Sequence, residues 1–417
     1  MTGDARLLKL PGYGRFWSAT TISAFGTPVT AFALQILALN TLHASATQLG
    51  LLNAARWAPY LLLGLVVGVL VDRYRRKPVL VATDLGRAAL LCVLPVLAFA
   101  DRLTMSALAL VVFVFGVLSL LFDAADQSFL PRLVPERLLT AANARLEQSD
   151  AAAQTAGPLL AGGLIKVVGA PVAILVDAVS YLVSGLLLAS IRVTEPAPRP
   201  VERRPVWREL REGLAYVYRH RMLAPAAVSS HLWFLANGML GTVYLAYGLR
   251  ELRIEEFWMA VTLGCASAGA VLGGGFATWA GRRFGAGWVS VAADIVMPVA
   301  WLLVPLARSG PSAVVLLAVA QFVSWVALAA ASPSEMAYRQ SVTPDRLQGR
   351  MNATIRSLNR GIIVVGAPLG GLLADTAGFR PALWTGIAGL AGAALIKLCS
   401  PYRHARVQDN EPSIAAG

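Results

Sequence analysis

The stretch VPERLLTAANA, residues 134–144, returns 209 residues later as TPDRLQGRMNA, residues 343–353, with its proline, acid, arginine, leucine, asparagine and alanine in place. Three further matches keep nearly the same offset: GPLLAGG (157–163) with GAPLGG (366–371), Asp126 with Glu335, and VLVATDL (79–85) with VSVAADI (289–295) at 210 residues. Separated matches at one offset indicate an internal duplication. The chain is therefore expected to fold as two similar halves.

The composition places both halves in a membrane. Of the 417 residues, 57% are hydrophobic and 14% are charged, and the mean hydropathy of +0.62 exceeds that of soluble domains. A helix needs about 20 mostly apolar residues to cross a bilayer. Twelve such segments lie near residues 16–42, 48–71, 78–100, 104–125, 148–168, 171–191, 223–248, 257–279, 287–307, 312–335, 357–378 and 381–400. We predict an all-α integral membrane protein with twelve transmembrane helices in two pseudo-symmetric six-helix bundles.

The distribution of basic residues predicts the orientation. With the N-terminus placed in the cytoplasm, 27 of the 36 Lys and Arg residues fall on the cytoplasmic side of the twelve spans. The positive-inside rule then puts both termini inside, in a multi-pass protein of the cell inner (plasma) membrane. The net charge of +13 does not indicate nucleic acid, because the basic residues stand between apolar runs and form no solvated stripe.

Four regions follow from this topology. We expect an N-terminal bundle at 1–192, a cytoplasmic linker at 193–221, a C-terminal bundle at 222–402 and a cytoplasmic tail at 403–417. The linker is first rich in proline and arginine, and then has apolar residues at helical spacing from Leu210 to Val217. That spacing predicts a short helix lying at the membrane interface.

Two parallel six-span halves are a transporter plan in which the substrate site lies between the halves and alternating access moves one half against the other. An enzyme is not expected, because the sequence has no P-loop, nucleophile elbow or metal-ligand spacing. The three cysteines are far apart and the four histidines are scattered, so we expect neither a metal nor a cofactor. Transport energy would then come from a gradient.

The stretch GVLVDRYRRKPVL, residues 68–80, follows the second span and resembles the loop signature of the major facilitator superfamily, with Arg75 where a second glycine is usual. In that family the aspartate meets the start of span eleven and an arginine meets an acid at the end of span four. The resemblance implies a cytoplasmic latch that favours the outward-open state. Its members here would be Gly68, Asp72, Arg73, Arg76, Lys77 and, preferred over Asp123, Asp126. Alternatively, these charges are only a topology signal.

AGPLLAGG in span five resembles the family's antiporter motif with one extra residue, which makes Gly157, Pro158, Gly162 and Gly163 a candidate helix-packing motif. Further stretches, among them LPRLVPERLLTAANA and VDAVSYLVSGLLL, resemble the bacterial transmembrane secretion effectors, which include siderophore and macrolide exporters. This resemblance implies export of a lipophilic small molecule.

Charged residues inside spans are costly and therefore candidates for coupling or substrate binding. Arg56 in span two could bind an anion or an acid, or reach the outer interface. Asp177 in span six could carry a proton or make a structural hydrogen bond. His231 in span seven could handle protons or substrate, or only pack. Asp84 and Asp294 are repeat equivalents, which indicates an architectural role.

Span one carries no acid, although many proton-coupled relatives have one beside its glycine; here Thr27 follows Gly26. The site of proton coupling is therefore open. An aromatic, sparsely charged cavity wall would suit a bulky amphipathic ligand. By family position its candidates are Phe25, Gln35, Phe115, Trp233, Asn237, Gln321 and Trp325, although any one aromatic could face lipid or the core.

The favoured hypothesis is a proton-coupled exporter of a lipophilic drug, macrolide or siderophore-like molecule, working as a monomer in the lipid bilayer with protons as the partner ion. The alternatives are an uptake permease or facilitator for a small anionic or polar solute anchored by Arg56, and a membrane enzyme or receptor.

Overall fold

The computed structural model describes residues 7–8, 10–72, 74–193, 195 and 206–406; within them, side chains are described except at 65–66, 68–70, 72, 136, 206–210, 345–346, 349–350 and 353. The described residues form helices and turns without a β-strand. Ten helical segments among them are long and apolar enough to cross a membrane. One of the ten contains two spans, and the helix at Ala46–Asp72 completes the twelve. The predicted all-α membrane fold is confirmed.

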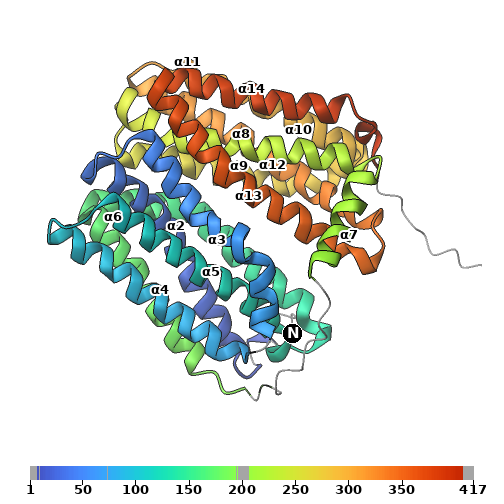
Figure 1. Ribbon diagram of the computed structural model, residues 1–417, viewed down its shortest axis with the longest axis horizontal. Helices are drawn as coiled ribbons and strands as arrows, with labels where there is room; N and C mark the ends of the chain where they lie inside the picture. Colours follow the sequence, from blue (N-terminus) through green and yellow to red (C-terminus); the bar gives the residue numbers. More distant parts are fainter. Residues whose placement is uncertain (1–6, 9, 73, 194, 196–205, 407–417) are drawn as a thin grey trace, which may run out of the picture.

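The first half consists of α2 (Tyr13–Ile36), α3 (Ala46–Asp72), α4 (Arg76–Phe99), α5 (Met105–Leu133) and α6 (Glu136–Ala189). Gly169 divides α6 into two spans, since its φ of 79° and ψ of 162° interrupt the helix. The second half consists of α8 (Leu223–Ala246), α9 (Glu256–Phe284), α10 (Ala286–Trp301) with the short α11 (Leu303–Leu306), α12 (Pro311–Ser341), α13 (Asp345–Ala377) and α14 (Phe379–Leu398). Between them lies α7 (Val206–Arg219), a helix where the linker pattern predicts one (Figure 1).

The duplication is visible in the backbone. Pro135 and Pro344, 209 residues apart, are the N-caps of α6 and α13. Gly169 and Gly378, also 209 apart, have left-handed φ values of 79° and 98° and turn the chain between the last two spans of each half. The π-helical turns η1 (Leu37–Thr41) and η2 (Tyr247–Glu251) end the first span of each half. The two halves therefore share one backbone plan.

Four helices extend beyond the predicted spans. The segments expected at 104–125, 148–168, 312–335 and 357–378 belong to helices that continue to Leu133, begin at Glu136, continue to Ser341 and begin at Asp345. All four extensions contain charged residues and lie at the end of the molecule that carries α7 and the arginine-rich connections, which we call the basic end. Hydropathy detects only the apolar part of a helix, so these turns escape it.

The two halves are in contact at the end opposite the basic end, which we call the closed end. Here α3 packs against α13, and α6 packs against α9. A side chain at Gly371 would place its Cβ 2.1 Å from the Ala46 carbonyl oxygen, and one at Gly162 would lie 2.4 Å from the Ala260 Cβ. Only glycine allows the helices to approach this closely.

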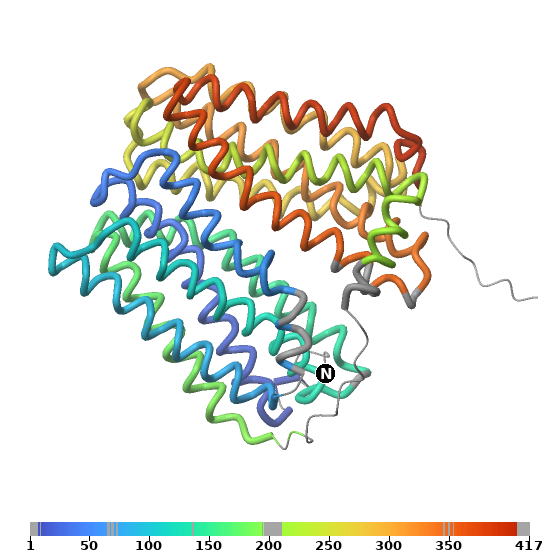
Figure 2. The backbone as a smooth tube through the Cα atoms, in the orientation of Figure 1, coloured from blue at the N-terminus to red at the C-terminus, as the bar shows by residue number. Residues whose placement is uncertain are grey.

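Toward the basic end the halves diverge. In Figures 1 and 2, α3 and α13 lie together at one end and separate toward the end with α7 and the N-terminus. Leu62, in the middle of α3, is 65% exposed, whereas Leu49 and Leu52 nearer the closed end are buried. The structure is therefore open at the basic end and closed at the other.

The close approach at Gly371 predicts an effect of a single methyl group. Gly371→Ala should lower the melting temperature of the purified protein, because overpacking costs about 1–3 kcal/mol and exceeds the gain of up to about 1 kcal/mol from higher helix propensity. Gly163→Ala is the matched control, since its Cβ would meet nothing within 4 Å. A Gly371→Ala protein that melts at or above the wild-type temperature would contradict this account.

Candidate functional site

A carboxylate joins the halves at the closed end. Asp375 near the end of α13 accepts hydrogen bonds from the Ala46 backbone N–H at 3.0 Å, the Thr47 N–H at 2.8 Å and the Thr47 hydroxyl at 2.6 Å. These N–H groups are the unpaired donors at the N-terminus of α3, where the helix dipole favours negative charge. Asp375 thus caps a helix of the other half. No sequence pattern indicated it, since the cap and its helix are more than 300 residues apart.

Two further contacts strengthen the closed end. The Arg250 guanidinium donates to the Ala44 carbonyl oxygen at 2.7 Å, and the Asn40 amide donates to the Glu256 carboxylate at 2.6 Å. Both contacts join the π-helical ends of the first spans to the other half. Polar contacts between the halves therefore accompany the glycine packing.

The predicted latch lies at the basic end. The surroundings of Gly68, the side chain of Asp72 and all of Arg73 are outside what the structure describes, so the role of these three residues stays a prediction. At the start of α4, the Glu195 carboxylate accepts hydrogen bonds from the backbone N–H groups of Arg76 at 2.7 Å and Lys77 at 2.8 Å. Sequence reasoning missed Glu195, whose only signal is an acid just after the last span of the first half.

Asp126 on α5 lies in a polar cavity within the first half. This cavity, the acidic pocket, has a volume of about 500 Å³ and lies between α2, α5 and α6. Its acids are Asp123, Asp126, Glu147 and Asp150, with Arg87 beside them. The Asp126 Oδ1 atom is buried and has no hydrogen-bond partner among the described residues, whereas Asp123 accepts a hydrogen bond from Tyr60 at 2.9 Å.

The repeat-equivalent acids Asp84 and Asp294 are each paired with a buried cation of their own half. In the first half Arg87 forms an ion pair with Asp84, and its guanidinium lies 4.3 Å from the ring centres of Phe122 and Tyr181. The Ser184 hydroxyl donates to the other Asp84 oxygen at 2.6 Å. These contacts tie α4, α5 and α6 together, which fits the architectural reading of Asp84.

The second half uses a different cation. The Lys397 ammonium on α14 lies 2.7 Å from Asp294 and 3.7 Å from Glu335, and Glu335 also pairs with Arg339. Asp84 and Asp294 are repeat equivalents, but Asp84 is paired within its own helix and Asp294 across helices. The duplication preserved the acids and not their partners.

The three coupling candidates lie in different places. Asp177 is fully buried: its Oδ1 accepts from Ser180 at 2.7 Å and packs against Gly26, while its Oδ2 has no hydrogen-bond partner among the described residues. Arg56 is half-buried on α3, 5.8 Å from the Trp57 ring centre, and forms no ion pair with a described residue. The structure does not bring the two into contact.

His231 connects three helices. One ring nitrogen lies 2.5 Å from the Tyr218 hydroxyl of α7, and the other lies 2.7 Å from the Asn359 amide oxygen of α13. Nearby, the His220 Nδ1 accepts from the Met222 and Leu223 N–H groups at 3.2 Å and caps α8. Partial burial lowers the pKa of His220 and favours the neutral ring that this cap requires. These contacts anchor α7 to the second half.

A second cavity lies where the halves diverge. This cavity, the cleft pocket, has a volume of about 600 Å³ and is lined by Trp57 of the first half and by α8, α10, α12, α13 and α14 of the second. Its wall combines aromatic rings, serines and asparagines with charged side chains. Such a mixture can hold an amphipathic molecule and fix its orientation.

The predicted cavity residues divide into four groups. Trp233 lines the cleft pocket, and its indole N–H points to the Met297 sulfur at 2.9 Å. Asn237 on α8, and Gln321 and Trp325 on α12, share the helix faces of the pocket residues by their spacing. Phe25 and Gln35 are half-buried on α2. Phe115 packs inside the first half, 5.8 Å from the Tyr181 ring centre, which places it in the core.

The antiporter-like motif lies partly between the halves. Gly162 makes the close contact with Ala260 of α9 described above. A Cβ at Gly157 would lie 2.5 Å from Pro28 of α2. A Cβ at Gly163 would meet no atom within 4 Å. Two of the three glycines therefore serve helix packing.

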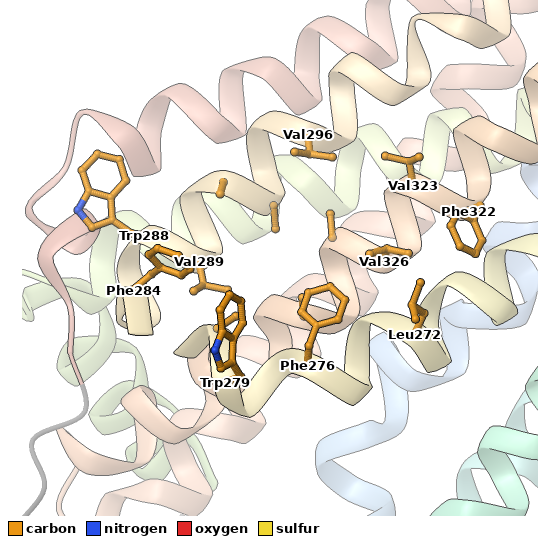
Figure 3. Close-up of a pocket in the computed structure, with 15 residues that line it drawn as sticks. Leu272, Phe276, Trp279, Phe284, Trp288, Val289, Val296, Phe322, Val323 and Val326 are labelled. Atoms are coloured by element: carbon orange, nitrogen blue, oxygen red, sulfur yellow. The ribbon is translucent and has the colours of Figure 1, made fainter. Parts of the chain in front are cut away.

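The largest of the three cavities is an apolar groove of about 630 Å³ between α9, α10 and α12, lined by aromatic and aliphatic side chains such as Phe276, Trp279 and Phe322 (Figure 3). Its lining has no charged residue, and its polar side-chain groups are the indole N–H groups of Trp279 and Trp288. Lipid chains would fill such a groove. The cleft pocket is the better candidate for substrate.

Two helical bundles with a cleft pocket open at one end define a membrane transporter built of two halves. The family model described as the Major Facilitator Superfamily matches residues 16–279, and the chain belongs to this family. The resemblance drawn from the loop after span two is thereby confirmed.

Among curated relatives, the chain is similar to macrolide efflux protein A of Streptococcus pyogenes, 23% identical over 62% of this chain and 64% of the relative, so less than two thirds of that protein is spanned. It is also similar to the multidrug efflux pump Tap of Mycolicibacterium fortuitum, 26% identical over 88% of this chain and 89% of the relative.

Among solved structures, the fold is similar to a bacterial homologue of the iron transporter ferroportin in its inward-facing state, with a TM-score of 0.75 and 18% identity over 94% of this chain and 98% of that one. The outward-facing structure of such a homologue gives a TM-score of 0.59, with 19% identity over 92% and 98% of the two chains. This likeness concerns the fold alone.

The cap at the closed end predicts a shift between conformations. Asp375→Asn should shift the equilibrium away from closure of this end about 5- to 30-fold, because asparagine removes the charge and one of the two acceptor oxygens, and losing charge-assisted hydrogen bonds costs about 1–2 kcal/mol. Spin labels at Arg102→Cys and Arg308→Cys, in a background without the three native cysteines, would report the distance across this end.

Glu255→Gln is the matched control, because Glu255 stands at the same end and its side chain makes no cap hydrogen bond. The control should keep the wild-type distance distribution. Equal distributions in Asp375→Asn and wild type would show that the cap does not hold the halves together.

Proposed function

We propose that the chain is a secondary active transporter that exports a lipophilic small molecule by alternating access, driven by protons. The observation that carries this proposal is the cleft pocket, which is open at the basic end while the halves meet at the closed end. With the basic end in the cytoplasm, as the positive-inside rule favours, the pocket would load from inside the cell. A drug, macrolide or siderophore-like molecule fits its size and its aromatic rings.

Two further observations support export. Macrolide efflux protein A and the multidrug efflux pump Tap are both named for efflux. The sequence also lacks a nucleotide-binding loop, so the energy would come from an ion gradient. Uptake of an anion held by Arg56 gains no comparable support.

Asp177 is the acid we propose for proton coupling. Its carboxylate packs against Gly26 of α2, so an acid from α6 reaches the point where proton-coupled relatives carry one on span one. Neighbouring Ser23 and Thr27 line the acidic pocket, which would give protons a polar path. A buried carboxylate with one unpartnered oxygen can exchange a proton when the surroundings change.

In the outward-open state the latch residues would act at the basic end. Asp72 would cap the start of α13 and Arg73 would meet Asp126, while Gly68, Arg76 and Lys77 would allow and stabilise the approach. At the closed end, Asp375 caps α3 through the same attraction between a carboxylate and the N-terminus of a helix. Alternation would then exchange one cross-half cap for the other.

Transport in inside-out vesicles tests both the direction and the role of Asp177. Wild-type vesicles with an acidic interior should accumulate a lipophilic dye or macrolide, and a protonophore should abolish the accumulation. Asp177→Asn should reduce gradient-driven accumulation at least about 10-fold, in line with the loss of a proton-transfer group.

Asp177→Asn should at the same time keep substrate exchange without a gradient, because asparagine retains the Ser180 contact. Asp101→Asn, in an exposed turn where asparagine also tolerates the left-handed backbone, is the control and should behave as wild type. Export that is insensitive to the protonophore, or unchanged in Asp177→Asn, would refute proton coupling through this acid.

A further inference from the structure

The cleft pocket contains six charged side chains, and four of them neutralise one another. Asp294 and Glu335 are its acids, and each lies within 4 Å of Lys397; Glu335 also pairs with Arg339. All four are held at the second-half wall. The remaining two charges are the guanidinium groups of Arg356 and Arg360.

Arg356 and Arg360 have no carboxylate within ion-pair distance among the described side chains. Neither forms an ion pair within 4 Å of any described residue, and Arg356 is exposed at the pocket wall. The two residues are four apart on α13, so they lie on one face of the helix about one turn from each other. Asp123 of the first half attracts both guanidinium groups from a distance, and neither is held in a direct ion pair with a described residue. Both therefore keep N–H donors that can bind an anion.

Arg360 is held in place by aromatic rings. Its guanidinium lies 4.5 Å from the Tyr60 ring centre and 5.5 Å from that of Trp57, both on α3 of the first half. Stacking on rings leaves the edge of the guanidinium, with its N–H donors, free to bind an oxyanion. The rings therefore orient the arginine, and no described carboxylate occupies its N–H donors.

The rest of the wall suits an amphipathic molecule. Trp233 and Phe234 form an edge-to-face pair with ring centres 4.8 Å apart, beside Ile355 and Ile363. Asn352 and Ser332 add neutral hydrogen-bonding groups. Apolar rings on one side and two free guanidinium groups on the other match a ligand that has an apolar body and an acidic head.

We infer that Arg356 and Arg360 bind the acidic group of the transported molecule, and that the substrate is an amphiphilic organic anion with a carboxylate or phosphate head. The inference rests on the proposed transport function and assigns it a substrate class. Arginine binds such oxyanions through paired N–H donors, which lysine cannot reproduce.

The facing wall of the first half carries negative charge. Asp123 accepts a hydrogen bond from the Tyr60 hydroxyl, and the Arg360 guanidinium lies over the same Tyr60 ring. Asp123 also lines the acidic pocket. An anion would therefore bind on the α13 side, whereas a cation would be drawn to the acidic pocket. The charge preference of the cleft pocket can therefore be measured with probes that differ in charge.

Three pyrene probes of matched shape measure it: 1-pyrenebutyrate, 1-pyrenebutanol and 1-pyrenebutylamine. Binding to the purified full chain in detergent is followed by energy transfer from tryptophan, because Trp57 and Trp233 line the pocket. In low salt the wild type should bind the butyrate at least about 10-fold more tightly than the butanol, as expected for a charge-assisted bidentate contact. The butylamine should bind more weakly than the butyrate.

The double variant Arg356→Gln, Arg360→Gln should bind butyrate and butanol with affinities within about threefold of each other, as expected without a charged partner. Its butanol affinity shows that the variant is folded. Arg356→Lys, Arg360→Lys keeps the charges and should retain part of the preference. The matched control Arg102→Gln, Arg308→Gln removes two exposed arginines outside the pocket and should keep the wild-type preference.

Equal wild-type affinity for butyrate and butanol, tightest binding of the butylamine, or an unchanged preference in the Arg356→Gln, Arg360→Gln variant would each overturn the inference. The binding assay needs no gradient. Absence of export in vesicles would therefore count against the proposed function, and the anion preference could still be measured. An absent anion preference would count against this inference, and export could still be measured.

Discussion

The fold depends on how closely α3 and α13 can approach. Gly371 brings the α13 backbone against the Ala46 carbonyl, and Asp375 then reaches the free N–H groups at the start of α3. Neither contact would form without the other, since the carboxylate can cap the helix only when the backbones touch. In a bilayer, where apolar contact between helices gains little over lipid, such close packing and charge-assisted hydrogen bonds are what hold two bundles together.

The sequence predicted the fold because long apolar runs and a duplication are strong, local signals. The twelve spans, the helix at Leu210–Val217 and the family follow from hydropathy, spacing and one loop signature. Helix ends were the weak point: α5 and α12 continue in polar turns that hydropathy does not register.

The site was harder to predict, because its partners are distant in sequence. Arg356 and Arg360 read as part of the positive-inside signal, and only the packing of α13 places them in the cleft pocket. Asp375 and Glu195 cap helices of other segments, which no periodicity records. Phe115 was assigned to the cavity wall by family position, but the kink and packing of α6 bring Tyr181 against it in the core. The general place of the site could be predicted, and its chemistry could not.

The internal ion pairs make each half stiff, and this has a mechanical consequence. Arg87 and Lys397 each tie several helices of their own half, while the halves touch along α3 and α13 from Gly371 to Gly361 and along α6 and α9. These contacts together form a pivot, and the part of α13 beyond Gly361 is a lever arm of about 24 Å to its start at Asp345, at 1.5 Å per residue. A rotation of about 10° at the pivot would carry the far end by about 4 Å, enough to widen or narrow a path for a small molecule. Large displacement at one end thus needs only small adjustments of packing at the other.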